Sequence, residues 1–165
     1  MKKIGNIIWF LFLGGFWSWA LWLVVALLCF VSIVGIPWGR ACYNVSEFSS
    51  GPFGREAINR HQLTQKKDIG TSIFGTLGNL IWFLLIGWWM TLAHVGAGVL
   101  CCATVVLIPF GIQHFKLAGL SISPIGKSIV SHELADETRR VNARADLNEI
   151  RMGLPVADVK EYDKI

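Results

Sequence analysis

Charged side chains are scarce in this chain of 165 residues, and two long stretches have none at all. Asp, Glu, Lys and Arg make up only 16% of the residues, and none of them lies between Gly5 and Gly39 or between Gly78 and Gly111. An uncharged apolar run of about 18 residues is long enough to cross a bilayer. A surface helix of a soluble protein, by contrast, carries a polar face. The two stretches therefore predict an integral membrane protein.

The sequence also lacks the motifs by which many enzymes and metal sites are recognised. It contains no HExxH, no glycine-rich phosphate loop and no Ser-His-acid set, and its four cysteines have no CxxC spacing. His61 and His132 lie in the linker and the tail without evident chemical partners. We therefore expect no enzyme activity, no metal and no cofactor.

The formal net charge of +4 would suggest a nucleic-acid partner in a soluble protein. No basic stretch alternates with aromatic residues here, so we expect no nucleic-acid binding. Lys and Arg instead mark the loops of a membrane protein and contact anionic headgroups. The lipid bilayer is thus the first expected partner.

The two apolar stretches are copies of one another, and the second follows the first at a nearly constant offset. Matching apolar residues alone could arise by chance, but here Asn, Pro, Gly and a basic residue also match in order. Duplicated halves are a common way to build membrane proteins, and sites often lie where the halves meet. The matched pairs are Asn6 with Asn79, Trp9 with Trp82, Gly14 with Gly87, Cys29 with Cys102 and, after a one-residue slip, Pro37 with Pro109 and Arg55 with Lys127.

Each stretch is too long for one straight membrane-crossing helix, so we expect a bend in each copy. Gly14 and Gly15 are the candidate hinges in the first copy, and Gly87 in the second. Aromatic residues at both ends of the remaining segments suit the two interfacial belts. The expected spans are 16–36 and 88–108, preceded by short helical arms at 5–13 and 78–86.

Pro37 and Pro109 predict the start of a new helix in each copy, because proline is tolerated in the first turn and not in the interior. The first of these helices is amphipathic, with Arg40 and Glu47 on its polar side. In the second, Lys116 can extend toward the headgroups. We expect short helices at the membrane interface, with these three side chains as interfacial charges.

Topology stays open between two arrangements. The N-terminus, the middle segment and the tail are all basic, so the positive-inside bias places all three in the cytoplasm. Two single spans cannot satisfy that, whereas two helical hairpins that enter and leave on one side and turn near the glycines can. A cytoplasmic C-terminal tail is expected in particular.

The sequence thus predicts an all-α integral membrane protein with two tandem repeats and a polar C-terminal helix. Each repeat is either a bent transmembrane helix or a re-entrant helical hairpin, followed by the short amphipathic helix. Leu134, Val141 and Ala145 give the polar helix a narrow apolar seam, which either packs on a neighbouring subunit or stays solvated. The expected divisions are repeat 1 at 5–58, a linker at 59–77, repeat 2 at 78–130, the polar helix at 131–152 and a flexible tail at 153–165.

Four polar residues of the repeats are candidates for a pore or for bridges between helices. His94 lies in the middle of the second apolar stretch, and an ionisable group there suggests function, although a neutral imidazole can simply bond across helices. Asn6 and Asn79 occupy equivalent places and suit helix bridging, with a polar pore ring as the alternative. His114 is a polar position of the second proline-started helix.

The pattern GN-x-x-W-F, then IP-[WF]-G, then P-x-G-[RK] occurs twice and resembles the YccF-type inner membrane proteins of bacteria, which carry an inner membrane component domain. The resemblance extends from Met1 to about Arg144. It implies a small multi-pass protein of the bacterial cytoplasmic membrane. It implies no substrate, activity or catalytic residue.

Two functions remain in view. Two spans or hairpins are too few to enclose a pathway, so conduction requires several subunits, and we expect a homo-oligomer that forms a pore, ion channel or transport-related assembly. The alternative is a non-conducting structural or regulatory subunit that binds a partner membrane protein.

Overall fold

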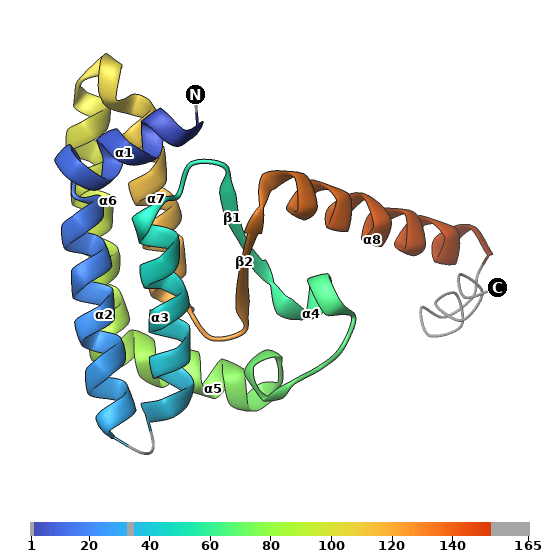
Figure 1. Cartoon of the computed structure of the whole chain (residues 1–165). Helices are drawn as coiled ribbons and strands as arrows, with labels where there is room; N and C mark the ends of the chain where they lie inside the picture. Colours follow the sequence, from blue (N-terminus) through green and yellow to red (C-terminus); the bar gives the residue numbers. More distant parts are fainter. Residues whose placement is uncertain (1, 33–34, 153–165) are drawn as a thin grey trace.

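Two helical repeats, a two-stranded ribbon and a projecting helix make up the computed structural model, which describes residues 2–32 and 35–152 (Figure 1). The tail expected at 153–165 lies outside the described residues. Repeat 1 contains α1 (Lys2–Phe12), α2 (Gly15–Val31), α3 (Ile36–Ser50) and β1 (Arg55–Asn59). Repeat 2 contains α5 (Ile73–Trp82), the π-helical turn η3 (Phe83–Gly87), α6 (Trp88–Ala103), η4 (Val105–Leu107), α7 (Ile108–Ile122) and β2 (Lys127–Ser131). Between them lie α4 (Arg60–Thr64) and η2 (Ile69–Thr71), and α8 (His132–Met152) follows β2.

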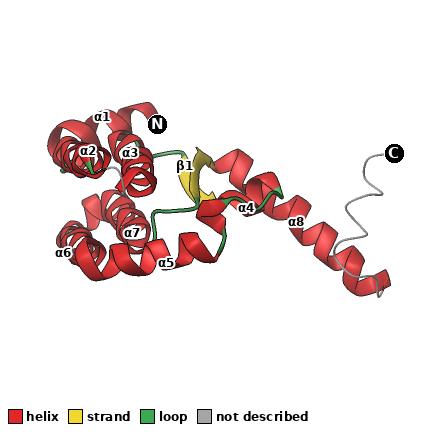
Figure 2. Cartoon of the chain, turned by 90° about the horizontal axis from the view of Figure 1, so that it is seen from below, coloured by secondary structure: helices red, strands yellow, loops and turns green. Residues whose placement is uncertain are grey.

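Each repeat is a helical hairpin. α2 packs along α3, and α6 packs along α7. Both returning helices begin at Ile-Pro, with the proline in the first turn as expected. Figure 2 shows the two hairpins side by side, with the ribbon, α4 and α8 all on one side of them. The predicted helical membrane fold with two repeats is therefore confirmed.

The chain reverses direction at the end of α2 and of α6, and the prediction that each hairpin turns near its glycines is wrong. α2 and α6 each end five residues before the expected end of the span, at Val31 and Ala103. Ser32 and Thr104, which follow them at equivalent places in the two copies, both adopt extended backbone angles. Each hairpin therefore turns just before its proline-started helix, and α3 and α7 are its second legs.

The glycines instead mark the junction between the first helix and the hairpin. α1 and α2 meet at an angle of 72°. Gly14 has a φ of +86°, which glycine adopts without steric cost, so the sharp bend occurs there. In repeat 2 the same junction is the π-helical turn, which ends at Gly87 and joins α5 to α6 without a break in the helix. Such a turn is a common cause of helix bending.

The one-residue slip between the copies lies earlier than the sequence alignment placed it. A Cβ on Gly15 would lie 2.5 Å from Trp9 Cδ1, and a Cβ on Gly87 would lie 3.0 Å from Trp82 Cδ1. The structural equivalent of Gly87 is therefore Gly15 and not Gly14. The extra residue of repeat 1 sits at the α1–α2 bend, and from there on the copies keep the offset that separates Gly15 from Gly87. Cys29 thus corresponds to Cys101.

The ribbon joins the two repeats and has no counterpart in the sequence prediction. β1 and β2 pair antiparallel, with Ala57 opposite Ile129 at the centre. These two residues are themselves equivalent in the repeats, because the same offset separates them. The flanking backbone bonds match as well, because Arg60 N–H donates to Gly126 O at 2.8 Å and His132 N–H donates to Gly54 O at 3.1 Å. A half-turn about the centre of the ribbon therefore exchanges the repeats.

Tryptophan side chains fix the ends of the hairpins. Trp9 Nε1–H donates to Ser49 O at 2.7 Å, and Trp82 Nε1–H donates to Ser121 O at 2.8 Å. These carbonyls lie in the last turns of α3 and α7, where the helix leaves acceptors unpaired. The core around them is buried and largely aromatic or aliphatic, and it includes Trp9, Trp22, Val45, Phe48, Trp82 and Leu117.

Candidate functional site

The two asparagines predicted as bridges hold a loop within their own repeat. Asn6 Oδ1 accepts from Phe53 N–H at 2.9 Å and its Nδ2 donates to Phe53 O at 3.3 Å. Asn79 makes the same pair of bonds with Ile125, at 3.0 and 3.1 Å. Each amide thereby satisfies both backbone groups of one residue just before a strand. The bonds tie the first helix of each repeat to the start of its strand.

His94 and His114 face each other between the two legs of the second hairpin. Both side chains are buried, and their Nδ1 atoms lie 3.3 Å apart. At that distance one Nδ1–H donates and the other Nδ1 accepts. The centroid of the His114 ring also lies 4.7 Å from the centroid of the Trp9 ring in repeat 1. Both histidines are candidate residues in the sequence, but the sequence gives no sign that they meet, because they lie 20 residues apart on different helices.

The histidine pair has no counterpart in repeat 1. The equivalent positions there hold Trp22 and Cys42. Trp22 stacks on Trp82 with ring centroids 6.0 Å apart. Within the described residues no group of three or more His, Cys, Asp or Glu side chains could hold a metal ion. The pair is therefore a buried polar contact within one chain, in which a single proton lies between the two Nδ1 atoms.

Five titratable residues form a connected cluster beside the ribbon. Lys116 Nζ lies 3.3 Å from His132 Nε2, and His132 Nδ1 lies 3.0 Å from Glu56 Oε2. Arg139 Nη1 donates to Glu56 Oε1 at 2.8 Å, and its Nη2 donates to Asp136 at 2.6 Å. The hydrogen bond from Arg139, helped by the one from His132, holds the pKa of Glu56 below its usual value. The inference that His132 has no partner is therefore wrong.

The other predicted interfacial charges lie on α3. Glu47 forms an ion pair with Arg55 at 3.6 Å, within the same repeat. Arg40 lines a cavity between the repeats and makes no ion pair with any described residue.

The start of α1, the linker helix α4 and α8 meet on one side of the molecule. Lys2 Nζ lies 2.5 Å from Glu133 Oε1, which draws the start of α1 to the start of α8. This contact holds the pKa of Glu133 at about 2. Asn142 Nδ2 donates to Gln62 O at 3.0 Å, so α8 also binds the linker helix α4. We call the surface formed by β1, β2, α4 and α8 the polar face.

The remaining surface is apolar over long segments. Two helical stretches are long and apolar enough to cross a membrane, Ile73–Ala103 and Val105–Ile122, and the bent pair α1–α2 is a third if it is counted as one span. On α1, Ile4, Leu11 and Phe12 are exposed, because no other described part of the chain covers them. Such surface suits lipid and not water.

The comparisons with known proteins agree with this distribution. The model of the YccF family, described as an inner membrane component domain, matches residues 4–55 and 77–127. Inner membrane protein YccF of Escherichia coli (strain K12) is 36% identical over 145 residues, which cover 87% of this chain and 97% of that protein. Inner membrane protein YccF of Shigella flexneri gives the same values. The chain belongs to the YccF family.

As a member of the YccF family, this chain is a multi-pass helical protein of the inner membrane. Each of the two YccF matches ends at the first residue of a strand, Arg55 in β1 and Lys127 in β2. The relatives are named as membrane proteins and not as enzymes. No solved structure matches the chain.

Proposed function

We propose that this YccF-family protein is a non-conducting membrane subunit that presents its polar face in the cytoplasm and assembles with further copies through α8. The observation that carries this proposal is the gathering of every described charged segment on one side, with a helix that projects from it.

The placement of the polar face in one compartment rests on direct contacts. All Lys, Arg, Asp and Glu residues lie outside 4–39 and 69–115. The strands that follow the two apolar segments are hydrogen-bonded to one another, and Lys2 contacts Glu133. Paired strands cannot face opposite sides of a bilayer. On this proposal the two strands, and with them the segments that join the repeats, lie in one compartment.

The cytoplasm is the side that fits the charge. Short loops rich in Lys and Arg stay on the cytoplasmic side of bacterial membranes. Here all 15 Lys and Arg residues fall in the three polar segments. The anionic headgroups of that leaflet attract them further. On this proposal α8 lies in the same compartment.

α8 supports an assembly role because it is long, polar and little packed within the subunit. It spans 21 residues, and Ala135 is its only buried residue. Leu134 is 47% exposed and Val141 is 51% exposed, although neither lies in an apolar segment. Together with Ala145 they follow one side of the helix at spacings of seven and four residues. A second copy of α8, with the same mixture of both charges around its seam, covers such a surface.

The stoichiometry of the full-length protein in lipid nanodiscs tests the proposal. We expect more than one copy per particle for the wild type and a shift toward one copy for Val141→Glu, which places a charge in the seam. Ala143→Glu adds the same charge at an exposed position on the opposite side of α8 and should leave the assembly intact. A wild type with one copy, or equal effects of the two variants, would overturn the role of the seam.

A homo-oligomeric pore is the second candidate function. The observation that favours it is the histidine pair, since ionisable groups within apolar segments often mark proton or ion paths. Both rings are buried inside one subunit, so such a path would run through the subunit or be opened by assembly. Flux through sealed liposomes separates this candidate from the first.

A further inference from the structure

An open cavity of about 910 Å³ lies between the two repeats. It is separate from the histidine pair and from the seam of α8. Its walls come from α3, from η2 and α5, and from the loop that leads into β2. Duplicated membrane proteins often bind their ligands where the halves meet. The cavity is therefore a candidate site independent of the assembly role of α8.

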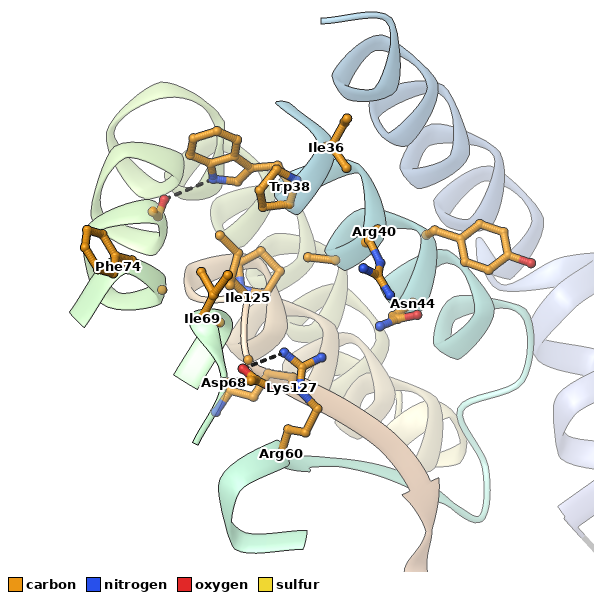
Figure 3. A pocket seen from close by; sticks show the side chains of 18 of the residues that line it. Ile36, Trp38, Arg40, Asn44, Arg60, Asp68, Ile69, Phe74, Ile125 and Lys127 are labelled. Carbon is orange, nitrogen blue, oxygen red and sulfur yellow. Dashed lines mark hydrogen bonds and ion pairs between the residues drawn. The ribbon is translucent and has the colours of Figure 1, made fainter. Parts of the chain in front are cut away.

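The walls of the cavity divide into an apolar part and a cationic part. In Figure 3, Trp38, Phe74 and Ile125 lie toward one end, and Arg40, Arg60 and Lys127 lie toward the other. Trp38 is held in place by a 3.0 Å bond from its Nε1–H to Gly78 O. Phe74 is 70% exposed, so the apolar end opens onto the lipid-facing surface of α5.

The cationic end carries charge that the protein does not neutralise. Asp68 accepts two hydrogen bonds from Arg60, through Nε and Nη2, and so pairs with that residue. Arg40 and Lys127 have no ion-pair partner among the described residues. Two cations therefore remain for an anion bound in the cavity. A guanidinium is well shaped to bind phosphate oxygens through two parallel bonds.

The half-turn that exchanges the repeats relates this cavity to a second position between them. That position has the same fold around it but lacks such a site. Phe53 occupies the place that Ile125 holds here, and its ring packs on Phe110 with centroids 5.2 Å apart. Phe110 is the equivalent of Trp38, and Ile112 stands where Arg40 does. The aromatic pair, with one ring from each repeat, thus fills the equivalent space, which has no cation at the place of Arg40, whereas the cavity itself stays open and charged.

We propose that this cavity binds the phosphate headgroup of an anionic membrane phospholipid, with Arg40 and Lys127 at the phosphate and an acyl chain along Trp38, Phe74 and Ile125. A basic pocket between membrane helices recognises such headgroups. The apolar end favours a lipid over a free phosphate, because a small soluble anion has no group to place against it. The site does not depend on the assembly of α8.

Lipid retention measured by native mass spectrometry tests the site on the full-length protein in a neutral detergent. The probes are phosphatidylglycerol, phosphatidylcholine with the same acyl chains, the soluble headgroup glycerophosphoglycerol, and inorganic phosphate. We expect the wild type to retain phosphatidylglycerol roughly tenfold better than phosphatidylcholine, since each cation near a headgroup contributes modestly. Neither soluble probe should displace the lipid at equal concentration.

Three variants sharpen the measurement. Arg40→Gln with Lys127→Gln should reduce phosphatidylglycerol to the level of phosphatidylcholine. Ile125→Phe should do the same without removing charge, because it reproduces the residue that closes the equivalent space in repeat 1. Lys66→Gln with Lys67→Gln removes the same charge from exposed linker positions and should retain the lipid.

Equal lipid loss in the linker variant and the cavity variant would overturn the site in favour of general charge attraction. Displacement by glycerophosphoglycerol or phosphate would overturn the lipid assignment and indicate a small-anion site. If the double cavity variant does not fold, Arg40→Gln alone provides the test, because Arg40 is exposed and pairs with no described residue. Full retention in both Arg40→Gln and Ile125→Phe would exclude the site.

Discussion

Trp9 and Trp82 make the same hydrogen bond in the two repeats, from the indole N–H to the carbonyl of Ser49 at 2.7 Å and of Ser121 at 2.8 Å. Trp22 is equally buried, yet its Nε1 has no partner within the described residues. Because all three tryptophans lie in the core, a comparison of the three separates the effect of the hydrogen bond on stability from the effect of packing. The bonds of Trp9 and Trp82 also show that the end of each hairpin is held by a side chain of the helix that precedes it.

We expect Trp9→Phe and Trp82→Phe to destabilise the protein more than Trp22→Phe does. Each substitution removes a similar volume, but only the first two also leave a carbonyl unpaired, which costs about 1 kcal/mol more. The difference corresponds to roughly 2–4 °C in the melting midpoint for a chain of this size. Thermal unfolding in detergent measures it. Equal midpoints for the three variants would contradict the proposed role of the indole bonds.

The shared polar face predicts that three distant positions label from one side of the membrane. Single cysteines at Lys3, Lys66 and Glu149, in a background without the four native cysteines, should all react with a membrane-impermeant maleimide in inside-out vesicles. Right-side-out cells should protect all three until they are lysed. A cysteine at Leu100, which is exposed on the lipid-facing helix α6, serves as the unreactive control. Labelling of the three positions from different sides would exclude the shared compartment, and labelling of all three from the outside would exclude its cytoplasmic placement.

Lowering the pH should weaken the contact between α8 and the ribbon, because it protonates Glu56. Arg139 lowers the pKa of Glu56 in the folded protein, so the folded state favours the carboxylate. The corresponding stability is complete above the usual pKa of about 4.5 and is lost as the pH falls through the lowered folded value. We therefore expect the hydrogen-exchange protection of the first turns of α8, taken relative to the intrinsic exchange rate at each pH, to fall below about pH 4.5 in the wild type.

Glu56→Gln provides the control for this pH effect. Its α8 should be less protected already at neutral pH, and the loss of protection between pH 4.5 and 2 should be smaller, with Glu133 accounting for the remaining part. Identical pH profiles for the wild type and Glu56→Gln would show that the cluster does not hold α8 against the ribbon.

Flux measurements decide between the two candidate functions. Sealed liposomes that contain folded protein should show no more flux of protons, K⁺ or Cl⁻ than empty liposomes, across a range of pH. His94→Ala should then change stability but not flux, because His94 Nδ1 contacts His114 inside the subunit. A protein-dependent flux that changes in His94→Ala would instead establish a pore and place the histidine on its path.

The repeat and the helices could be predicted because their signals are local. Pro37 and Pro109 mark helix starts through their own backbone geometry, and the uncharged runs identify the membrane segments directly. The duplication was visible because Asn6, Trp9 and their partners interrupt an otherwise apolar pattern. The structure assigns these residues bonds that explain the pattern, since Asn and Trp hold the loop and the helix end in both copies.

The features missed by sequence analysis all depend on distant contacts. β1 and β2 have five residues each and pair across the whole length of a repeat, so no local alternation reveals their partner. The His94–His114 contact requires that α7 fold back along α6, which the expected interfacial helix would not do. The position of the slip was also hidden, because Gly14 and Gly15 are adjacent and only the contact with Trp9 tells them apart.

The central pair of the ribbon has a consequence for how this chain can be divided. Ala57 and Ile129 hold the same place in their repeats, so the ribbon is self-complementary, as an interface between two identical chains is. A protein with a single repeat would carry one unpaired strand and could complete it only with a second molecule. The linker between α4 and η2 then acts as a tether that turns such a dimer into a single chain. Cutting it between Lys66 and Lys67 should leave two fragments that associate without any covalent link.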